Sequence, residues 1–135
     1  MNNELRWKQR FQNFEKAYEV FNRRKADNEK EPNNESHQMS FIQAYEIIFE
    51  LSWKTMKDFL ENEGYDNVKN AKKTIRQAFQ DEIIRDAEGW MEALEKRNNT
   101  SHTYNPDILV EMVEFIDKSF YPNVRDLYHY LKKEL

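Results

Sequence analysis

Apolar side chains recur every three or four positions along most of this chain. In the first part the spacing is 4, 3, 4, 3, which is typical of an amphipathic helix that packs in a bundle. The residues at these positions are almost all aromatic rings: Trp7, Phe11, Phe14, Tyr18 and Phe21. The pattern predicts a first helix from about Glu4 to Arg24, whose seam is core or partly a dimer interface.

A second helix is predicted from about Met39 to Asn62, with Ser40 and Gln43 as a capping box near its start. Gly64 is placed to end it in a left-handed conformation. Apolar residues surround more than one face of this helix, so we expect it to be central. They are Phe41, Ile42, Tyr45, Ile48, Phe49, Trp53, Met56 and Leu60.

Shorter helices are predicted at about 67–80 and 87–101. The core positions expected in the first of these are Val68, Ala71, Ile75, Ala78 and Phe79. The sequence Asn105-Pro106-Asp107 predicts another start, because Asn caps a helix, Pro suits its first turn and Asp favours its positive end.

Two segments interrupt this periodicity. The stretch from Lys25 to His37 is polar and rich in Asn, and it predicts a flexible connection between helices. Pro122 is expected to break or kink the last helical segment.

Composition supports an all-α fold in one domain, residues 1–135. Only 2 Gly and 3 Pro are present, too few for a sheet with many hairpins, and 34% of the residues are charged, as solvated helix faces require. No apolar run approaches the roughly 18 residues of a membrane span, and the start does not resemble a signal peptide. We therefore expect a cytoplasmic protein that does not enter membranes.

Charge and residue types narrow the chemistry. With no Cys and three scattered histidines (His37, His102 and His129), we expect neither a protein-bound metal nor thiol chemistry, and no cofactor is predicted. The net charge of -4 argues mildly against a generic nucleic-acid binder but leaves room for a local basic patch.

The stretch from Arg97 to Tyr104 carries the strongest chemical signal. It places an Arg, a His and a Tyr at a predicted helix end, just before another helix starts. Arg97 and His102 lie about 140° apart on an ideal helix, so they converge only if the helix ends or tightens between them. With a ribose 2′-hydroxyl as nucleophile, His102 as acid or base and Arg97 as phosphate ligand suffice for RNA cleavage, and Asn98 can orient either group. The alternative is a capping and ion-pair cluster.

Several other polar residues allow two interpretations, one functional and one structural. Glu46 falls in an apolar stripe, so it either orients Arg97 or His102 across the bundle or reaches solvent at an edge. Glu50 is expected to be a solvated neighbour or a partner of Lys54. A basic stripe can track RNA or an adenylylated partner, or be a solvated face. It consists of Lys69, Lys72, Lys73 and Arg76.

Arg97-x4-His102-x-Tyr104 resembles the signature of the HEPN superfamily (higher eukaryotes and prokaryotes nucleotide-binding). More narrowly, the chain resembles the nucleotidyltransferase substrate-binding protein family. The similar blocks are residues 49–60 (FELSWKTMKDFL), 75–79 (IRQAF) and 90–104 (WMEALEKRNNTSHTY).

This resemblance implies an up-and-down four-helix bundle with an additional short helix, and a homodimer with a shared cleft. It also implies a minimal nucleotidyltransferase as partner. In related pairs the HEPN chain is a ribonuclease toxin, and the partner adenylylates the tyrosine that corresponds to Tyr104. An alternative view makes the HEPN chain a substrate-binding subunit that holds RNA or a nucleotide. The chain departs from the family at Ala44, where a basic residue is frequent.

Overall fold

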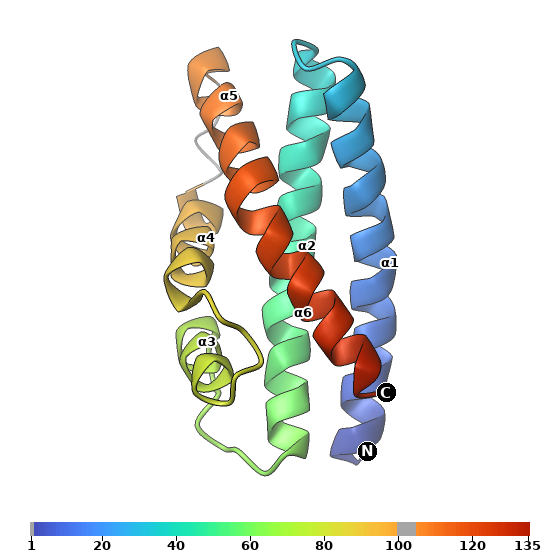
Figure 1. Ribbon diagram of the computed structural model, residues 1–135, viewed down its shortest axis with the longest axis vertical. Coiled ribbons are helices and arrows are strands. Elements are labelled where there is room, and N and C mark those ends of the chain that lie inside the picture. Colours follow the sequence, from blue (N-terminus) through green and yellow to red (C-terminus); the bar gives the residue numbers. More distant parts are fainter. Residues whose placement is uncertain (1, 100–104) are drawn as a thin grey trace.

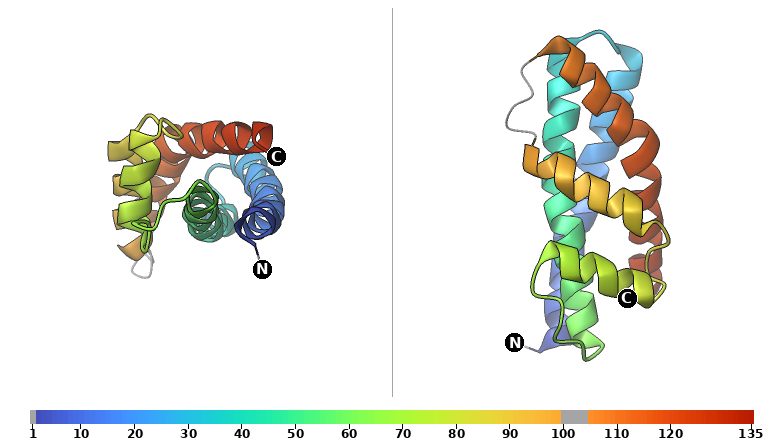
Figure 2. Two further views of the ribbon diagram at one scale, coloured as in Figure 1. Left: turned by 90° about the horizontal axis from the view of Figure 1, so that it is seen from below. Right: turned by 90° about the vertical axis from the view of Figure 1, so that its left-hand side faces the viewer.

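Three long rods and two short helices make up this computed structural model, which describes residues 2–99 and 105–135. Helices α1 (Asn3–Lys30) and α2 (Glu35–Asn62) form an antiparallel pair (Figure 1). The third rod runs through α5 (Pro106–Phe115), a π-helical turn η2 (Ile116–Phe120) and α6 (Tyr121–Lys133). The short helices α3 (Ala71–Gln80) and α4 (Ala87–Asn99) lie across the side of α2 (Figure 2). The predicted all-α bundle is confirmed.

Helix α2 occupies the centre of the core, as the width of its apolar stripe predicts. Tyr45, Ile48 and Phe49 are fully buried. Phe120 of the third rod and Trp90 of α4 pack edge to face with ring centroids 5.6 Å apart, and both rings contact Phe49. This aromatic cluster ties α4 to the long helices.

The aromatic seam of α1 is also part of the core. Four of its five rings are buried (Trp7, Phe11, Phe14 and Phe21). The fifth, Tyr18, stacks on Tyr128 of α6 with centroids 4.3 Å apart. The predicted seam therefore packs against both α2 and the third rod.

The connection between α1 and α2 is shorter than the predicted residues 25–37 and spans only residues 31–34. Helix α1 continues to Lys30, and α2 begins at Glu35 with Asn34, rather than Ser40, as its cap. Ion pairs on the bundle surface accompany this added length of α1. Lys25 contacts Glu29 one turn along, and its Nζ lies 3.3 Å from Oδ1 of Asp117.

The end of α2 follows the expected left-handed geometry. Gly64 has φ of 103°, and the backbone N–H of Tyr65 donates to the carbonyl of Leu60 over 3.1 Å. These two features form a Schellman-type cap.

The inner face of α3 differs from the prediction at both ends. The helix starts at Ala71, capped by Asn70, instead of at residue 67. Phe79 was expected in the core, yet 48% of it is exposed. The helix ends at Gln80, and the next buried apolar residues are Ile83 and Ile84.

The third rod stays helical through Pro122, where the sequence predicts a break or kink. Pro122 lies in the first turn of α6, and the π-helical turn η2 directly precedes it. A proline ring clashes with the carbonyl four residues earlier, and a wider turn relieves that clash. At the other end of the rod, the Asn105 side chain accepts the N–H of Asp107 at 2.9 Å, which confirms the predicted cap. No helix in the described ranges has the length and apolar character to cross a membrane.

Candidate functional site

The candidate site lies where the last turn of α4 meets the middle of α2. Two contacts fix α4 in this position. Trp90 is buried against Phe49, and the Tyr45 hydroxyl donates to the carbonyl oxygen of Ala93 over 2.5 Å. Ala93 lies one turn before Arg97, so the register of α4 on α2 determines where the guanidinium lies.

Arg97 reaches across to two carboxylates on α2. Its Nη1 lies 3.7 Å from Oε2 of Glu46, and its Nε lies 3.8 Å from Oε1 of Glu50. The two acids share one face of α2 because they are four residues apart. Each of the three side chains is between 30% and 38% exposed, so the cluster is accessible to water.

Glu50 is the member of this cluster that sequence reasoning missed. It also accepts a hydrogen bond from the indole N–H of Trp53, 3.2 Å away. The available signal was its position one helical turn after Glu46, on the side that faces α4.

Electrostatics hold the guanidinium in place and leave the cluster negative. One guanidinium between two carboxylates has a formal charge of −1, so an incoming phosphate meets repulsion as well as attraction. Burial raises the pKa of Tyr45 above its ordinary value, and the nearby Arg97 acts in the opposite direction. The Tyr45 hydroxyl therefore remains a proton donor at neutral pH.

The other predicted site residues fall into two groups. Asn98 is exposed in the last turn of α4, beside Arg97. His102 and Tyr104 lie outside the described residues. Ala44, where the resemblance noted above leads one to expect a basic residue, is buried, with 7% of it exposed.

The predicted basic stripe lies on and just before α3. Lys69, Lys72, Lys73 and Arg76 are all exposed. The last three of them border a hollow of about 300 Å³ together with Leu94 of α4. Leu94 lies one turn before Arg97, so the basic stripe and the Arg97 cluster are on neighbouring parts of the surface.

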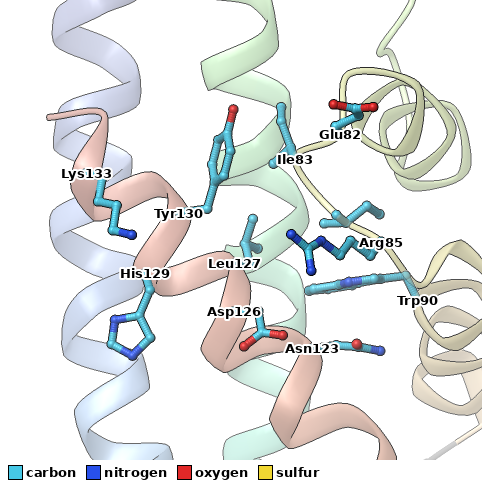
Figure 3. Close-up of a pocket in the computed structure, with 11 residues that line it drawn as sticks. Glu82, Ile83, Arg85, Trp90, Asn123, Asp126, Leu127, His129, Tyr130 and Lys133 are labelled. Carbon is cyan, nitrogen blue, oxygen red and sulfur yellow. The ribbon is translucent and has the colours of Figure 1, made fainter.

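A larger pocket of about 430 Å³ lies between α6 and the segment that joins α3 to α4 (Figure 3). Its lining combines Trp90 and Tyr130 with the charged side chains of Arg85 and Asp126. Sequence reasoning did not identify it, because its residues come from distant parts of the chain. Within residues 2–99 and 105–135, no three His, Asp or Glu side chains are grouped so that they could hold a metal ion.

Comparison with known proteins places this architecture in one family. The family model described as "Nucleotidyltransferase substrate binding protein like" matches residues 9–133, which cover most of α1 and all of the later helices. A search of curated proteins found no match.

Proposed function

Because this chain belongs to the nucleotidyltransferase substrate binding protein like family, we propose that it is the HEPN component of a two-gene nucleotidyltransferase module. In this proposal it is a toxin with metal-independent endoribonuclease activity, and its nucleotidyltransferase partner regulates it. One observation carries the proposal. Arg97, the first residue of the Arg97-x4-His102-x-Tyr104 motif, is oriented by two α2 carboxylates at an accessible surface.

The proposed reaction is an internal transfer at phosphorus. The ribose 2′-oxygen attacks the adjacent phosphate and gives its proton to a base, while the bond to the 5′-oxygen breaks and that oxygen takes a proton from an acid. The products are a 2′,3′-cyclic phosphate and a 5′-hydroxyl. His102 serves as the general acid or base. Arg97 stabilises the charge that develops on the phosphate oxygens. Glu46 positions Arg97, and Asn98 assists from the next position on α4.

Regulation is proposed to act on Tyr104. The nucleotidyltransferase transfers AMP from ATP to the Tyr104 oxygen, pyrophosphate leaves, and the phenolic proton is released. The added phosphate places negative charge beside the RNA-binding groups and thereby opposes RNA binding. Mass spectrometry of Tyr104 after co-expression with the partner tests this step directly.

A homodimer is part of the proposal, and exposed apolar side chains support it. Ile47, Ile108 and Val110 are 55%, 41% and 54% exposed on α2 and α5. Burial of such side chains between two copies is favourable. Ile47 lies between Glu46 and Glu50 in sequence, so this contact would bring a second chain close to the Arg97 cluster.

Cleavage of RNA by the purified chain in EDTA tests the catalytic proposal. We expect the unmodified chain to cleave RNA, and Arg97→Ala and His102→Ala to lose the activity. Arg23→Ala and His129→Ala are matched controls, because both residues are exposed on other helices. Absence of cleavage by the unmodified dimer, or equal cleavage by His102→Ala, would reject the ribonuclease.

A second candidate is a non-catalytic subunit that presents a nucleotide or other substrate to the transferase. The negative formal charge of the Arg97 cluster favours this non-catalytic role, because the guanidinium already lies between two carboxylates. This version predicts no RNA cleavage, a stable complex with the transferase, and transferase activity that depends on the complex. It fails if neither the chain nor the complex binds a nucleotide.

A further inference from the structure

We propose that the outer face of α3 is a binding site for single-stranded nucleic acid, with Phe79 as the ring on which a base stacks. Phe79 is 48% exposed. Among the described residues it is the only Phe, Tyr or Trp that is classed as exposed; the other rings are buried or half-buried. An apolar ring exposed to water offers a surface whose burial by a ligand is favourable.

The register of the helix places this ring in line with cations. Lys72, Arg76 and Phe79 follow one another at spacings of 4 and 3, so they form one stripe along α3. Lys69 precedes the stripe at the helix start, and Lys73 lies beside it. At the other end, Phe79 shares a hollow of about 570 Å³ with Arg85 and Glu82.

In the described part of the chain, the structure gives no ion pair to the side chains of this set: Lys69, Lys72, Lys73, Arg76 and Arg85. The segment from Asn67 to Gln80 holds four basic residues and no acidic residue. The nearest acids in sequence flank it, and one of them, Asp81, already accepts the hydroxyl of Tyr65 at 2.6 Å. A chain of net charge -4 therefore carries a concentrated positive strip.

The combination of cations and one exposed ring indicates which class of ligand binds here. A row of unpaired cations attracts a polyanion, and phosphates at regular intervals match a row of this kind. An exposed aromatic ring adds base stacking, which needs an unpaired base. Bases in a duplex are already stacked on each other, so the geometry favours a single strand over a double helix.

The strip also leads toward the Arg97 cluster. Leu94 of α4 borders the same hollow as Lys72 and Arg76, and it lies one turn before Arg97. A single strand that follows α3 from Phe79 therefore continues toward the end of α4. The binding site stands on its own observations, whereas the delivery of RNA to Arg97 rests on the proposed function.

Fluorescence anisotropy with the full chain and a labelled, single-stranded 2′-O-methyl RNA tests the site, because this probe binds but has no 2′-hydroxyl to react. We expect Phe79→Ala to weaken binding about tenfold and Phe79→Tyr, which keeps the ring, to stay within about twofold. Leu5→Ala is the matched control, since Leu5 is also 48% exposed but lies on α1. Circular dichroism checks that each variant is folded.

Three outcomes would overturn the proposal: no binding by the unmodified chain, equal binding by Phe79→Ala, or equally strong competition from an acidic polypeptide, which would mark a protein-docking face. A duplex that binds as well as the single strand would also reject the stacking. The two proposals fail separately. Phe79-dependent binding without cleavage of ordinary RNA rejects only the ribonuclease, and cleavage with an unchanged KM in Phe79→Ala rejects only this site.

Discussion

The Arg97 cluster and the outer face of α3 differ in how their positive charges are surrounded. Arg97 lies between Glu46 and Glu50, and α4 is fixed on α2 by buried aromatic packing and the Tyr45 hydroxyl. The cations of α3 extend into solvent without an ion pair among the described residues. One region therefore holds a single guanidinium between two acids, whereas the other presents a row of exposed charges.

This difference separates positioning from attraction. Two carboxylates reduce the net pull of Arg97 on an anion but restrict its orientation, and orientation is what a reacting phosphate requires. Unpaired lysines have no fixed direction, yet they attract a polyanion over a distance set by the salt concentration. We infer that α3 binds the RNA strand and that Arg97 stabilises the reacting phosphate.

The largest effect is expected from a change that keeps charge but removes geometry. Arg97→Lys should lower RNA cleavage by about 100-fold or more, because lysine cannot make a planar two-point contact with Glu46, Glu50 or a phosphate. Arg76→Lys is the matched control on α3, and it should stay within about twofold. Single-turnover cleavage assays measure both variants. Equal losses for the two would remove the distinction between the regions.

A smaller effect is expected when one carboxylate of the cluster is neutralised. Glu50→Gln should lower kcat about tenfold through a less restricted guanidinium, while KM falls or stays constant because a repulsive charge is gone. Glu95→Gln on the exposed side of α4 is the control. A rise in KM with unchanged kcat would show that Glu50 contacts substrate instead of positioning Arg97.

The salt dependence of binding should distinguish the two regions by a still smaller amount. The double change Lys72→Gln and Arg76→Gln should reduce the slope of log K against log salt by about 1.4, at about 0.7 for each lost phosphate contact. Arg97→Ala should change this slope less, because its guanidinium is already paired with carboxylates. Anisotropy titrations between low and moderate salt provide the slopes, and equal changes would contradict the comparison.

Much of the fold could be predicted because the spacing of apolar residues along a helix indicates which face is buried. The seams of α1 and α2 and the caps at Gly64 and Asn105 follow from residue type and spacing. The helical parts of the segment from 25 to 37 could not be predicted this way, because its polar residues show no apolar periodicity. The contact of Lys25 with Asp117 of the third rod joins residues far apart in sequence.

The candidate site was less predictable than the fold. Sequence reasoning placed Glu46 near Arg97 as one of two possibilities, and the structure brings them within 3.7 Å. It assigned Glu50 to solvent or to Lys54, because a local i,i+4 partner is visible in sequence whereas a contact from α4 is not. Phe79 was placed in the core for a similar reason. Its position satisfies the apolar periodicity, and only the turn after Gln80 shows that it faces outward.

The smallest expected effect is on the stability of the fold, and it tests whether paired cations contribute to that stability. On α6, Lys132 Nζ lies 3.4 Å from Oε2 of Glu15, and the hydroxyl of Tyr128 donates to the same carboxylate. These two contacts, with the Tyr128 hydrogen bond the stronger, lower the pKa of Glu15 from 4.5. The folded state therefore binds this proton less tightly than the unfolded state. The resulting stabilisation is present above about pH 4.5 and is lost as the pH falls through the lower folded value.

Glu15→Gln should therefore lower Tm by about 1–2 °C at neutral pH, and the difference from the unmodified chain should shrink below about pH 4. Glu19→Gln, an exposed acid on the same helix, is the control for the loss of a charge. Lys72→Gln should leave Tm unchanged or slightly higher, because an unpaired cation among other cations adds only repulsion to the folded state. Thermal unfolding at several pH values measures all three. A clearly lower Tm for Lys72→Gln would mean that the α3 cations stabilise the fold, which would contradict the view that they serve to bind a ligand.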